Sequence, residues 1–263
     1  MQRYFAKIIN NYAVLDDGDI HHLLNVMRAK VGSNIEIVDQ NNSYLAVIDS
    51  INPLKIKIEN TLDFNPELTS EVTLFFALAK GDKIDFVIQK ATELGVSKVV
   101  LFSSKRCVVD FSNKDIDKKL ARYSKIAKEA SEQSHRNSIP QIVGIIPFKN
   151  IKKEDLSELN LVAYEKLSES NTFLDEMKVK NSKSISVFIG PEGGFEEEEI
   201  NYLENLGVLP ISLGKRILRT ETAAVNILSI LSYIIEKWDC LNCYTKKGKR
   251  ERRSFQVMNM PTF

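Results

Sequence analysis

Beyond residue 70, apolar runs alternate with segments of helical spacing, and this alternation constrains the fold more than any other feature. The first apolar run spans 72–79, and apolar side chains then recur three or four positions apart over 84–94, before Gly95. Strands that are buried on both faces and joined by helices are typical of a parallel sheet, so the predicted class is α/β. Further strands are expected at 99–102, 141–146, 161–164, 184–189 and 208–213, with helices over 115–135, around 200–206 and over 223–238.

The first sixty residues instead predict short strands around one helix, which is typical of a small barrel. Asp17 or Asp19 can cap the helix. Residues 63–70 contain turn formers and a proline but no periodicity, as expected of a linker. We therefore predict one domain over 1–70, a second over 71–239 and a basic tail over 240–263. The strands are expected at 3–9, 35–37, 44–49 and 54–58, and the apolar helix face comprises Ile20, Leu23, Leu24 and Met27.

Composition narrows the class of protein. The chain has 263 residues, 43% hydrophobic and 27% charged, which is typical of a globular protein and long enough to favour two domains. No apolar stretch is long enough to span a membrane and the start lacks a secretory signal, so a cytoplasmic protein is expected. The three cysteines show no disulfide framework. The net charge of +1 gives no overall attraction to nucleic acid, so RNA binding would need local basic residues.

A glycine-rich turn, Gly190–Gly194, lies between a predicted buried strand and a helix. Glycine lacks a Cβ and lets a ligand approach the backbone closely. The glutamates at 196–199 already complement the dipole of the next helix, which argues against a phosphate site there. The dinucleotide and P-loop motifs are also missing. The turn therefore favours a ligand with an adenosine and no phosphate, although a purely structural turn would have the same sequence.

A second segment, 213–223, places Arg219 between a strand end and a helix start, beside Thr220. Ligands of α/β proteins bind at the carboxyl ends of strands, so Arg219 is a candidate for a site residue. The alternative is that Thr220 only caps the helix and that Arg219 pairs with a surface carboxylate.

Five ordered motifs carry a resemblance to a known family. They are HHLLNVMR at 21–28, KGDKIDFVIQKATELGV at 80–96, EASEQSHR at 129–136, GPEGG at 190–194 and LGKRILRTETAA at 213–224. Over residues 1 to about 238 the chain resembles the bacterial small-subunit rRNA (uracil-N3) methyltransferases, which modify uridine 1498 of 16S rRNA. The resemblance implies a SPOUT-type trefoil-knotted parallel sheet, a PUA-like barrel, S-adenosylmethionine as cofactor, and a homodimer with its pocket near the dimer interface.

The resemblance also implies roles for individual residues. Arg219 would stabilise the anion that develops on the uracil, and Glu192, Gln133 or Glu132 would orient the base or accept its proton. The cofactor would contact Leu167, Ile189, Gly190, Pro191, Glu192, Gly193, Leu213, Gly214, Leu218, Thr220, Thr222 and Ala223.

Several basic residues become candidates for RNA contacts, with ordinary solvated surface as the alternative. They are Arg3, Arg28, Lys80, Lys83 and Arg136. The basic run at 246–253 is either a solvated tail or an arm that contacts RNA. The histidines lack metal-ligand spacing and Cys240 with Cys243 supplies only two of four zinc ligands, so no metal is predicted.

Two other functions remain open. A ribose 2′-O or guanine N1 methyltransferase of the same knotted class could use a similar turn and arginine, although the 21–28 motif weighs against it. The other is a catalytically silent protein that binds RNA or assists subunit assembly. The presence of Gly193, Arg219 and Thr220 in the sequence argues against it. The expected substrate is the small ribosomal subunit, with the target base unpaired or turned outward, since N3 is hidden in a base pair.

Overall fold

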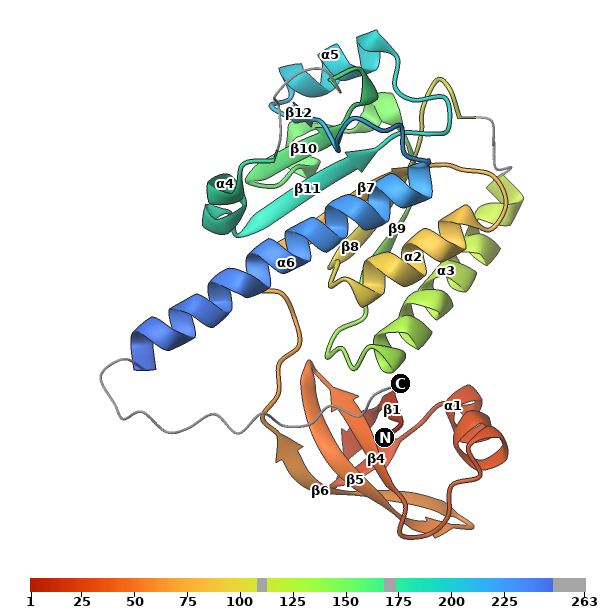
Figure 1. The fold of residues 1–263 in the computed structure, drawn as a ribbon. Helices are drawn as coiled ribbons and strands as arrows, with labels where there is room; N and C mark the ends of the chain where they lie inside the picture. The colour runs from red at the N-terminus through yellow and green to blue at the C-terminus, as the bar shows by residue number, and fades with distance from the viewer. Residues whose placement is uncertain (108–112, 168–173, 248–263) are drawn as a thin grey trace.

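The computed structural model describes residues 1–107, 113–167 and 174–247 and contains two six-stranded sheets, one on either side of 63–70 (Figure 1). The first sheet is curled and carries one short helix. The second is covered by helices. The α/β prediction is confirmed, and the two sheets use different pairing patterns.

The amino-terminal sheet has the strand order β1-β4-β5-β6-β3-β2, and all its pairs except β1 with β4 are antiparallel. Alternate apolar side chains of its strands point into one core around Tyr4, Leu23 and Ile48, as expected when only one face of a sheet is buried. The strands are β1 (Arg3–Phe5), β2 (Lys7–Ile9), β3 (Tyr12–Val14), β4 (Asn34–Asp39), β5 (Asn42–Ile51) and β6 (Leu54–Leu62).

The predicted helix of this domain exists, but its start and its form differ from the prediction. Asp16, rather than Asp17 or Asp19, caps α1 (Asp17–His21), because its carboxylate accepts a hydrogen bond from the Asp19 N–H at 2.8 Å. The helix continues as a π-helical turn, η1 (His22–Val26). Leu23 is fully buried, whereas Met27 is 41% exposed and lies beyond the turn.

The second sheet is parallel throughout, in the order β12-β10-β11-β7-β8-β9. Along β7, residues at 72, 74 and 76 pack in one core while Phe75 and Ala77 pack in another, which explains why the strand has no polar alternation. The strands are β7 (Glu71–Ala77), β8 (Lys98–Ser103), β9 (Gln141–Pro147), β10 (Leu159–Ala163), β11 (Ser184–Ile189) and β12 (Leu209–Ile211).

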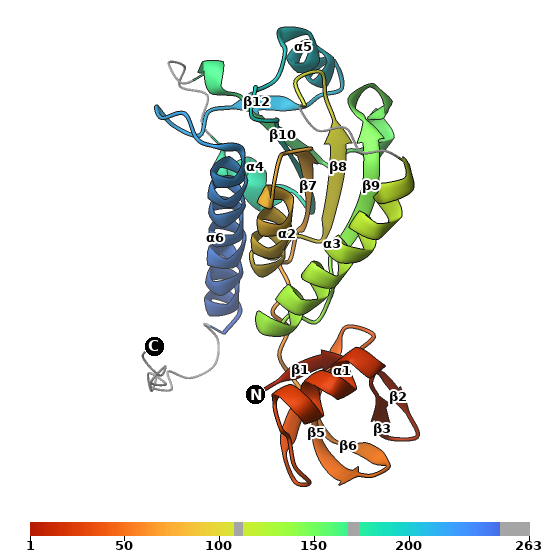
Figure 2. The same ribbon diagram turned by 90° about the vertical axis from the view of Figure 1, so that its right-hand side faces the viewer.

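Helices cover both faces of this sheet (Figures 1 and 2). One core is formed with α2 (Lys83–Glu93), α3 (Asn113–Gln133), α4 (Glu176–Asn181) and α6 (Thr220–Lys247). The opposite core is formed with α5 (Glu197–Asn205) and the 3-10 turn η2 (Phe148–Asn150). Two further 3-10 turns are η3 (Lys153–Asp155) and η4 (Glu165–Leu167). The sequence did not predict α4, which has only six residues.

The last helix is longer than predicted. It includes Thr220 and runs to Lys247 rather than ending near Trp238, so Lys246 and Lys247 of the basic run belong to it. The rest of that run and the tail to Phe263 lie outside the described residues. Within the described ranges, no helix is long and apolar enough to cross a membrane. The trefoil knot stays a prediction.

The barrel meets the larger domain at the carboxyl end of α3 (Figure 2). Lys128 of α3 forms ion pairs with Asp16 at 2.9 Å and Asp19 at 2.7 Å. Arg3 of β1 donates hydrogen bonds to the segment that follows α3. The start of α6 lies at the opposite end of the larger domain (Figures 1 and 2).

Candidate functional site

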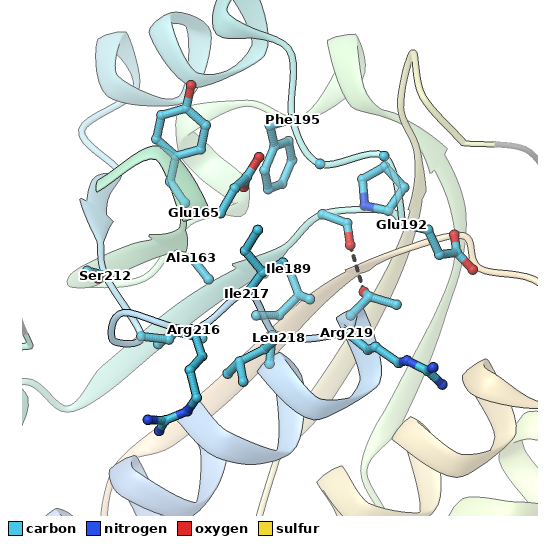
Figure 3. A pocket seen from close by; sticks show the side chains of 18 of the residues that line it. Ala163, Glu165, Ile189, Glu192, Phe195, Ser212, Arg216, Ile217, Leu218 and Arg219 are labelled. Carbon is cyan, nitrogen blue, oxygen red and sulfur yellow. Dashed lines mark hydrogen bonds between the residues drawn. The ribbon is translucent and has the colours of Figure 1, made fainter. Parts of the chain in front are cut away.

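A pocket of about 540 Å³ opens at the carboxyl ends of β10, β11 and β12, where α6 begins (Figure 3). Its walls come from three segments that are far apart in sequence: 163–165, 189–195 and 212–223. Ala163, Ile189 and Leu218 give it an apolar interior (Figure 3). This volume is in the range of small-molecule and cofactor sites. The crevice at the carboxyl ends of parallel strands is also where such folds bind ligands.

The glycine turn is held in place from two sides. The Thr220 hydroxyl, expected as a helix cap, donates a hydrogen bond to the Gly190 carbonyl oxygen at 2.7 Å (Figure 3). Arg106, on the loop after β8, donates to the Gly193 carbonyl oxygen at 2.8 Å and to both carboxylate oxygens of Glu196. A Cβ at position 190 would lie 3.0 Å from the ring of Phe195, so any larger residue there would press against that ring.

The segment before α6 supplies the cations of the pocket. Arg216 and Arg219 line it, and their side chains extend in different directions (Figure 3). Both are exposed, and neither guanidinium forms a hydrogen bond or ion pair with the part of the chain that the structure describes. Arg219 is therefore not committed to a surface carboxylate, and its charge is available to a ligand. Ile217, between them, is 88% exposed at the rim.

A network of opposite charges closes the side of the pocket next to α2. Lys83 Nζ lies 2.9 Å from Glu192 Oε1 and 3.6 Å from Glu221 Oε2. The Lys80 N–H donates to the same Glu192 oxygen at 3.2 Å. Burial alone would raise the pKa of Glu192, but these hydrogen bonds hold it below the usual range of a carboxyl. The hydrogen bond to Glu192 in turn raises the pKa of Lys83, so both groups are charged at neutral pH.

We expect Thr220→Ala to destabilise the fold and to weaken binding of S-adenosylmethionine, the cofactor that the resemblance implies. The change leaves the Gly190 carbonyl without its 2.7 Å partner. A buried polar group that loses its partner costs about 1–3 kcal/mol. Titration calorimetry with S-adenosylmethionine and thermal unfolding would measure both effects, with Thr220→Ser keeping the hydroxyl and Thr222→Ala as the exposed neighbour. Equal affinity in Thr220→Ala and wild type would show that this hydrogen bond does not shape the pocket.

The structure brings most of the predicted site residues together. The predicted cofactor residues all line the pocket except Leu167, which lies at the end of η4, and Thr222, which faces solvent on α6. Arg219 and Glu192 line it too. The sequence did not single out Glu165, Phe195, Ser212, Arg216 and Ile217. Three of these residues could have been found from the sequence by their position beside or inside the 213–224 motif: Ser212, Arg216 and Ile217.

Gln133 and Glu132 are predicted to act beside the reacting base, and the structure does not bring either of them to the pocket of the same chain. Both belong to the carboxyl end of α3, next to the barrel, and neither lines the pocket. Glu132 lies 3.9 Å from Lys128, within the ion-pair cluster that contains Asp19. The motif of residues 129–136 therefore builds the contact between the domains in this chain. Its polar side chains gave no sign of that role in the sequence.

Glu132 makes stability depend on pH. Burial and the nearby Asp19 charge raise the pKa of Glu132 from 4.5 to about 7. The folded state thus binds this proton more tightly than the unfolded state, and the group's contribution to stability is lost as pH rises from about 4.5 to 7. We expect Glu132→Gln to unfold at a higher temperature than wild type at pH 8, by a few degrees, since 1 kcal/mol shifts the midpoint by about 2–4 °C.

The advantage of Glu132→Gln should shrink at pH 5, where the wild-type carboxyl is protonated. Calorimetric scans at the two pH values measure this difference. Asp117→Asn, which removes an exposed carboxyl from the same helix, is the matched control. A midpoint difference that does not change between pH 5 and pH 8 would contradict the assignment.

The predicted RNA-contacting residues fall into two groups. Arg28 and Lys80 are exposed, and Lys83 is half-buried at the pocket. Arg3 and Arg136 are each 3% exposed, and their donors are bonded to protein acceptors. Burial leaves Arg3 and Arg136 little surface for RNA in this conformation, so the structure gives their predicted RNA contacts no support. Both side chains instead join parts of the chain.

No group of three or more His, Cys, Asp or Glu side chains that could hold a metal ion occurs among the described residues. Cys107 is a free, half-buried thiol. The Cys240 and Cys243 side chains lie outside the part of the chain whose side chains are described.

Comparison with family models defines the class. The model of the RNA methyltransferase domain matches residues 66–232, and that of the RNA methyltransferase PUA domain matches residues 15–59. The first match contains the pocket and the second lies within the amino-terminal sheet. The fold and the pocket thus define an RNA methyltransferase with a PUA-like domain.

Individual relatives specify the family. The ribosomal RNA small subunit methyltransferase E of Bacillus subtilis is 34% identical and covers 90% of this chain and 98% of its own. That of Mesomycoplasma hyopneumoniae is 35% identical over 87% of this chain and 98% of its own. The chain belongs to the ribosomal RNA small subunit methyltransferase E family, which confirms the resemblance.

A solved structure agrees over nearly the whole chain. The ribosomal RNA small subunit methyltransferase E from Neisseria gonorrhoeae, bound to S-adenosyl methionine, matches with a TM-score of 0.77 at 29% identity, over 89% of this chain and 98% of that one. A putative methyltransferase from Legionella pneumophila with bound cofactor matches with a TM-score of 0.76 at 28% identity, over 88% of this chain and 96% of that one.

Proposed function

We propose that this protein uses S-adenosylmethionine to methylate N3 of a uridine in the 16S rRNA of the small ribosomal subunit, at the position of the uridine 1498 type. The observation that carries the proposal is the pocket in which the glycine turn and the uncommitted Arg219 meet, in a chain with RNA methyltransferase and PUA domains. The named substrate of the relatives supports the rRNA assignment.

The pocket residues fit this cofactor. Ile189, Leu218 and Ala163 offer apolar surface for an adenine, and backbone groups of the glycine turn can approach it because no side chain intervenes at Gly193. The acidic first turn of α5, Glu197 to Glu199, is unsuited to a phosphate. When bound, the cofactor supplies an electrophilic methyl group on a sulfonium. Loops 163–165, 189–194 and 213–223 would hold it.

Methylation at N3 requires that the uracil lose its proton, so negative charge develops on the ring. Arg219 can stabilise that charge, because its guanidinium lines the pocket and forms no bond with the described part of the chain. An oriented charge that needs no rearrangement during the reaction lowers the barrier more than one that must move into place. We assign Arg219 to this role.

Glu192 suits a positioning role better than that of a base. Its carboxylate already accepts hydrogen bonds from Lys83 and Lys80, and its pKa lies below the usual range. A weak base of this kind takes a proton from uracil poorly. We assign Glu192, with Lys83, to ordering the pocket wall next to the substrate.

The two domains have separate roles. Residues 1–70 bind RNA, with exposed Arg28 as a contact, and residues 71–239 bind the cofactor and catalyse the transfer. Lys80 lies between β7 and α2 and Lys83 is the first residue of α2, where both can contact RNA that enters the pocket. We assign no role to residues 240–263.

The active form is a homodimer. Ile217 at the pocket rim is 88% exposed, and Ile230 and Tyr233 are exposed on α6. Exposed apolar side chains of this kind are better covered by protein than by water. Analytical ultracentrifugation should give twice the mass of the 29.9 kDa chain, and a monomer that is fully active would contradict this part of the proposal.

The test is methyl transfer from labelled S-adenosylmethionine to unmodified small subunits, followed by nucleoside mass spectrometry. The expected product is 3-methyluridine. A 2′-O-methylated nucleoside or 1-methylguanosine would replace the proposal with a sister activity of the same class. Failure of the purified protein to bind the cofactor would support a silent RNA-binding protein instead.

A further inference from the structure

Arg3 is a buried arginine of the barrel whose hydrogen bonds reach into the other domain. It is 3% exposed and lies in β1. Its Nη1 donates to the backbone oxygens of His135 and Arg136 at 2.6 and 2.9 Å, and to Asn137 Oδ1 at 2.7 Å. These acceptors are more than 130 positions away in sequence, directly after α3. One guanidinium thus joins the barrel to the end of a catalytic-domain helix.

The groups around Arg3 hold it in one orientation. Its Nε donates to Glu36 Oε2 at 2.8 Å, and the same oxygen lies 2.9 Å from His135 Nδ1. Burial would raise the pKa of Glu36, but the hydrogen bonds from Arg3 and His135 keep it below the usual range. The carboxylate therefore stays charged beside the arginine. A planar guanidinium with several fixed donors matches such an array, whereas a lysine ammonium does not.

A second contact between the domains, made by Lys128, restricts rotation of the barrel about the Arg3 contact. Lys128 of α3 binds Asp16 and Asp19, at the start of α1 and thus on a different element of the barrel from Arg3. The linker is fixed as well, because Glu67 accepts hydrogen bonds from Arg136, from Ser138 Oγ and from the Asn137 N–H. Attachment at separate points leaves the barrel little freedom relative to the catalytic domain.

The consequence concerns which nucleotide is modified. The joint lies at the carboxyl end of α3, and the pocket opens where α6 begins. The start of α6 is at the opposite end of the catalytic domain from the joint (Figures 1 and 2). Protein contacts to RNA phosphates set the position of the RNA rather than read its sequence. If the barrel positions the RNA, the distance from barrel to pocket decides which uridine reaches Arg219.

We propose that Arg3 is a positioning and specificity-determining residue that fixes the barrel relative to the pocket, and so selects the target uridine without touching RNA. This inference rests on the proposed function. It predicts that breaking the joint misplaces the RNA while the cofactor site, at the far end, is unaffected.

The test compares Arg3→Met with wild type in the full chain. Genetically encoded fluorophores at position 59 of the barrel and position 201 of α5, both exposed, report the interdomain distance by energy transfer. We expect a broadened distance distribution, a Kd for S-adenosylmethionine within about twofold of wild type, and kcat/KM for small subunits lowered at least tenfold, with methylation appearing at additional uridines. Lys153→Met, an exposed cation of η3 in the larger domain, is the control and should behave as wild type.

Two further variants cover the case that Arg3→Met fails to fold. Arg3→Lys keeps the charge, and Asn137→Ala removes one acceptor; both should show a smaller change in the same direction. An unchanged distance distribution in all three variants would overturn the inference, as would a broadened distribution with unaltered rate and site choice. If wild type itself transfers no methyl group to RNA, the proposed function fails, and this dependent inference fails with it.

Discussion

Arg219→Ala should lower methyl transfer to small subunits by about 100- to 1,000-fold, the loss typical of removing one group that stabilises developing charge. Arg219 lines the pocket and is exposed to it rather than paired with the described part of the chain. Its removal therefore takes a charge from the reaction without leaving a buried carboxylate unpaired. The effect should appear in kcat under saturating cofactor, with the Kd for S-adenosylmethionine changed much less.

Two comparisons make this result specific. Arg219→Lys keeps a charge but not the planar fork of donors, and should recover part of the rate. Lys125→Ala removes an exposed cation from α3, far from the pocket, and should keep the wild-type rate. Equal rates for Arg219→Ala and wild type would remove Arg219 from the catalytic assignment.

Gly190→Val should weaken cofactor binding by roughly 10- to 100-fold. The Cβ alone would lie 3.0 Å from two ring atoms of Phe195, and the ring is buried among Phe102 and Phe148. Overpacking of this kind costs about 1–3 kcal/mol, and 1.4 kcal/mol is a tenfold change in affinity. Because the ring has little room to move, the glycine turn must move instead, and the pocket wall moves with it.

Titration calorimetry with S-adenosylmethionine measures this loss, and circular dichroism verifies that the variant is folded. The matched control is Gly144→Ala in β9, where a new Cβ would make an ordinary 3.5 Å contact with Leu120. A folded Gly190→Val protein with wild-type affinity would show that the cofactor does not depend on this turn.

The periodic parts of the fold could be predicted from the sequence. Apolar runs predicted each strand of the parallel sheet, because the inner strands are buried on both faces and the edge strands β9 and β12 still carry apolar residues that pack against the cores. The cap of α1 was misplaced by one to three residues, because Asp16, Asp17 and Asp19 all have side chains that can cap. The short α4 has too few residues for a helical period to show.

The pocket was largely predictable and the joint between the domains was not. The glycine turn and Arg219 follow strand ends in the sequence, and the resemblance placed them in one cluster, as the pocket lining has them. Arg3 and Arg136 looked like surface cations, because a sequence does not show that acceptors such as the His135 oxygen lie opposite them. Gln133 ends α3 and does not line the pocket, which its position in the sequence does not show.

Methylation should be mapped along 16S rRNA by reverse transcription, after small subunits are incubated with the protein and S-adenosylmethionine. A methyl group on N3 blocks base pairing, so we expect one cofactor-dependent stop next to a single uridine, absent with Arg219→Ala. A methylated RNA without any new stop would place the methyl group off the pairing edge of the base, and this protein would then not be a uracil-N3 methyltransferase.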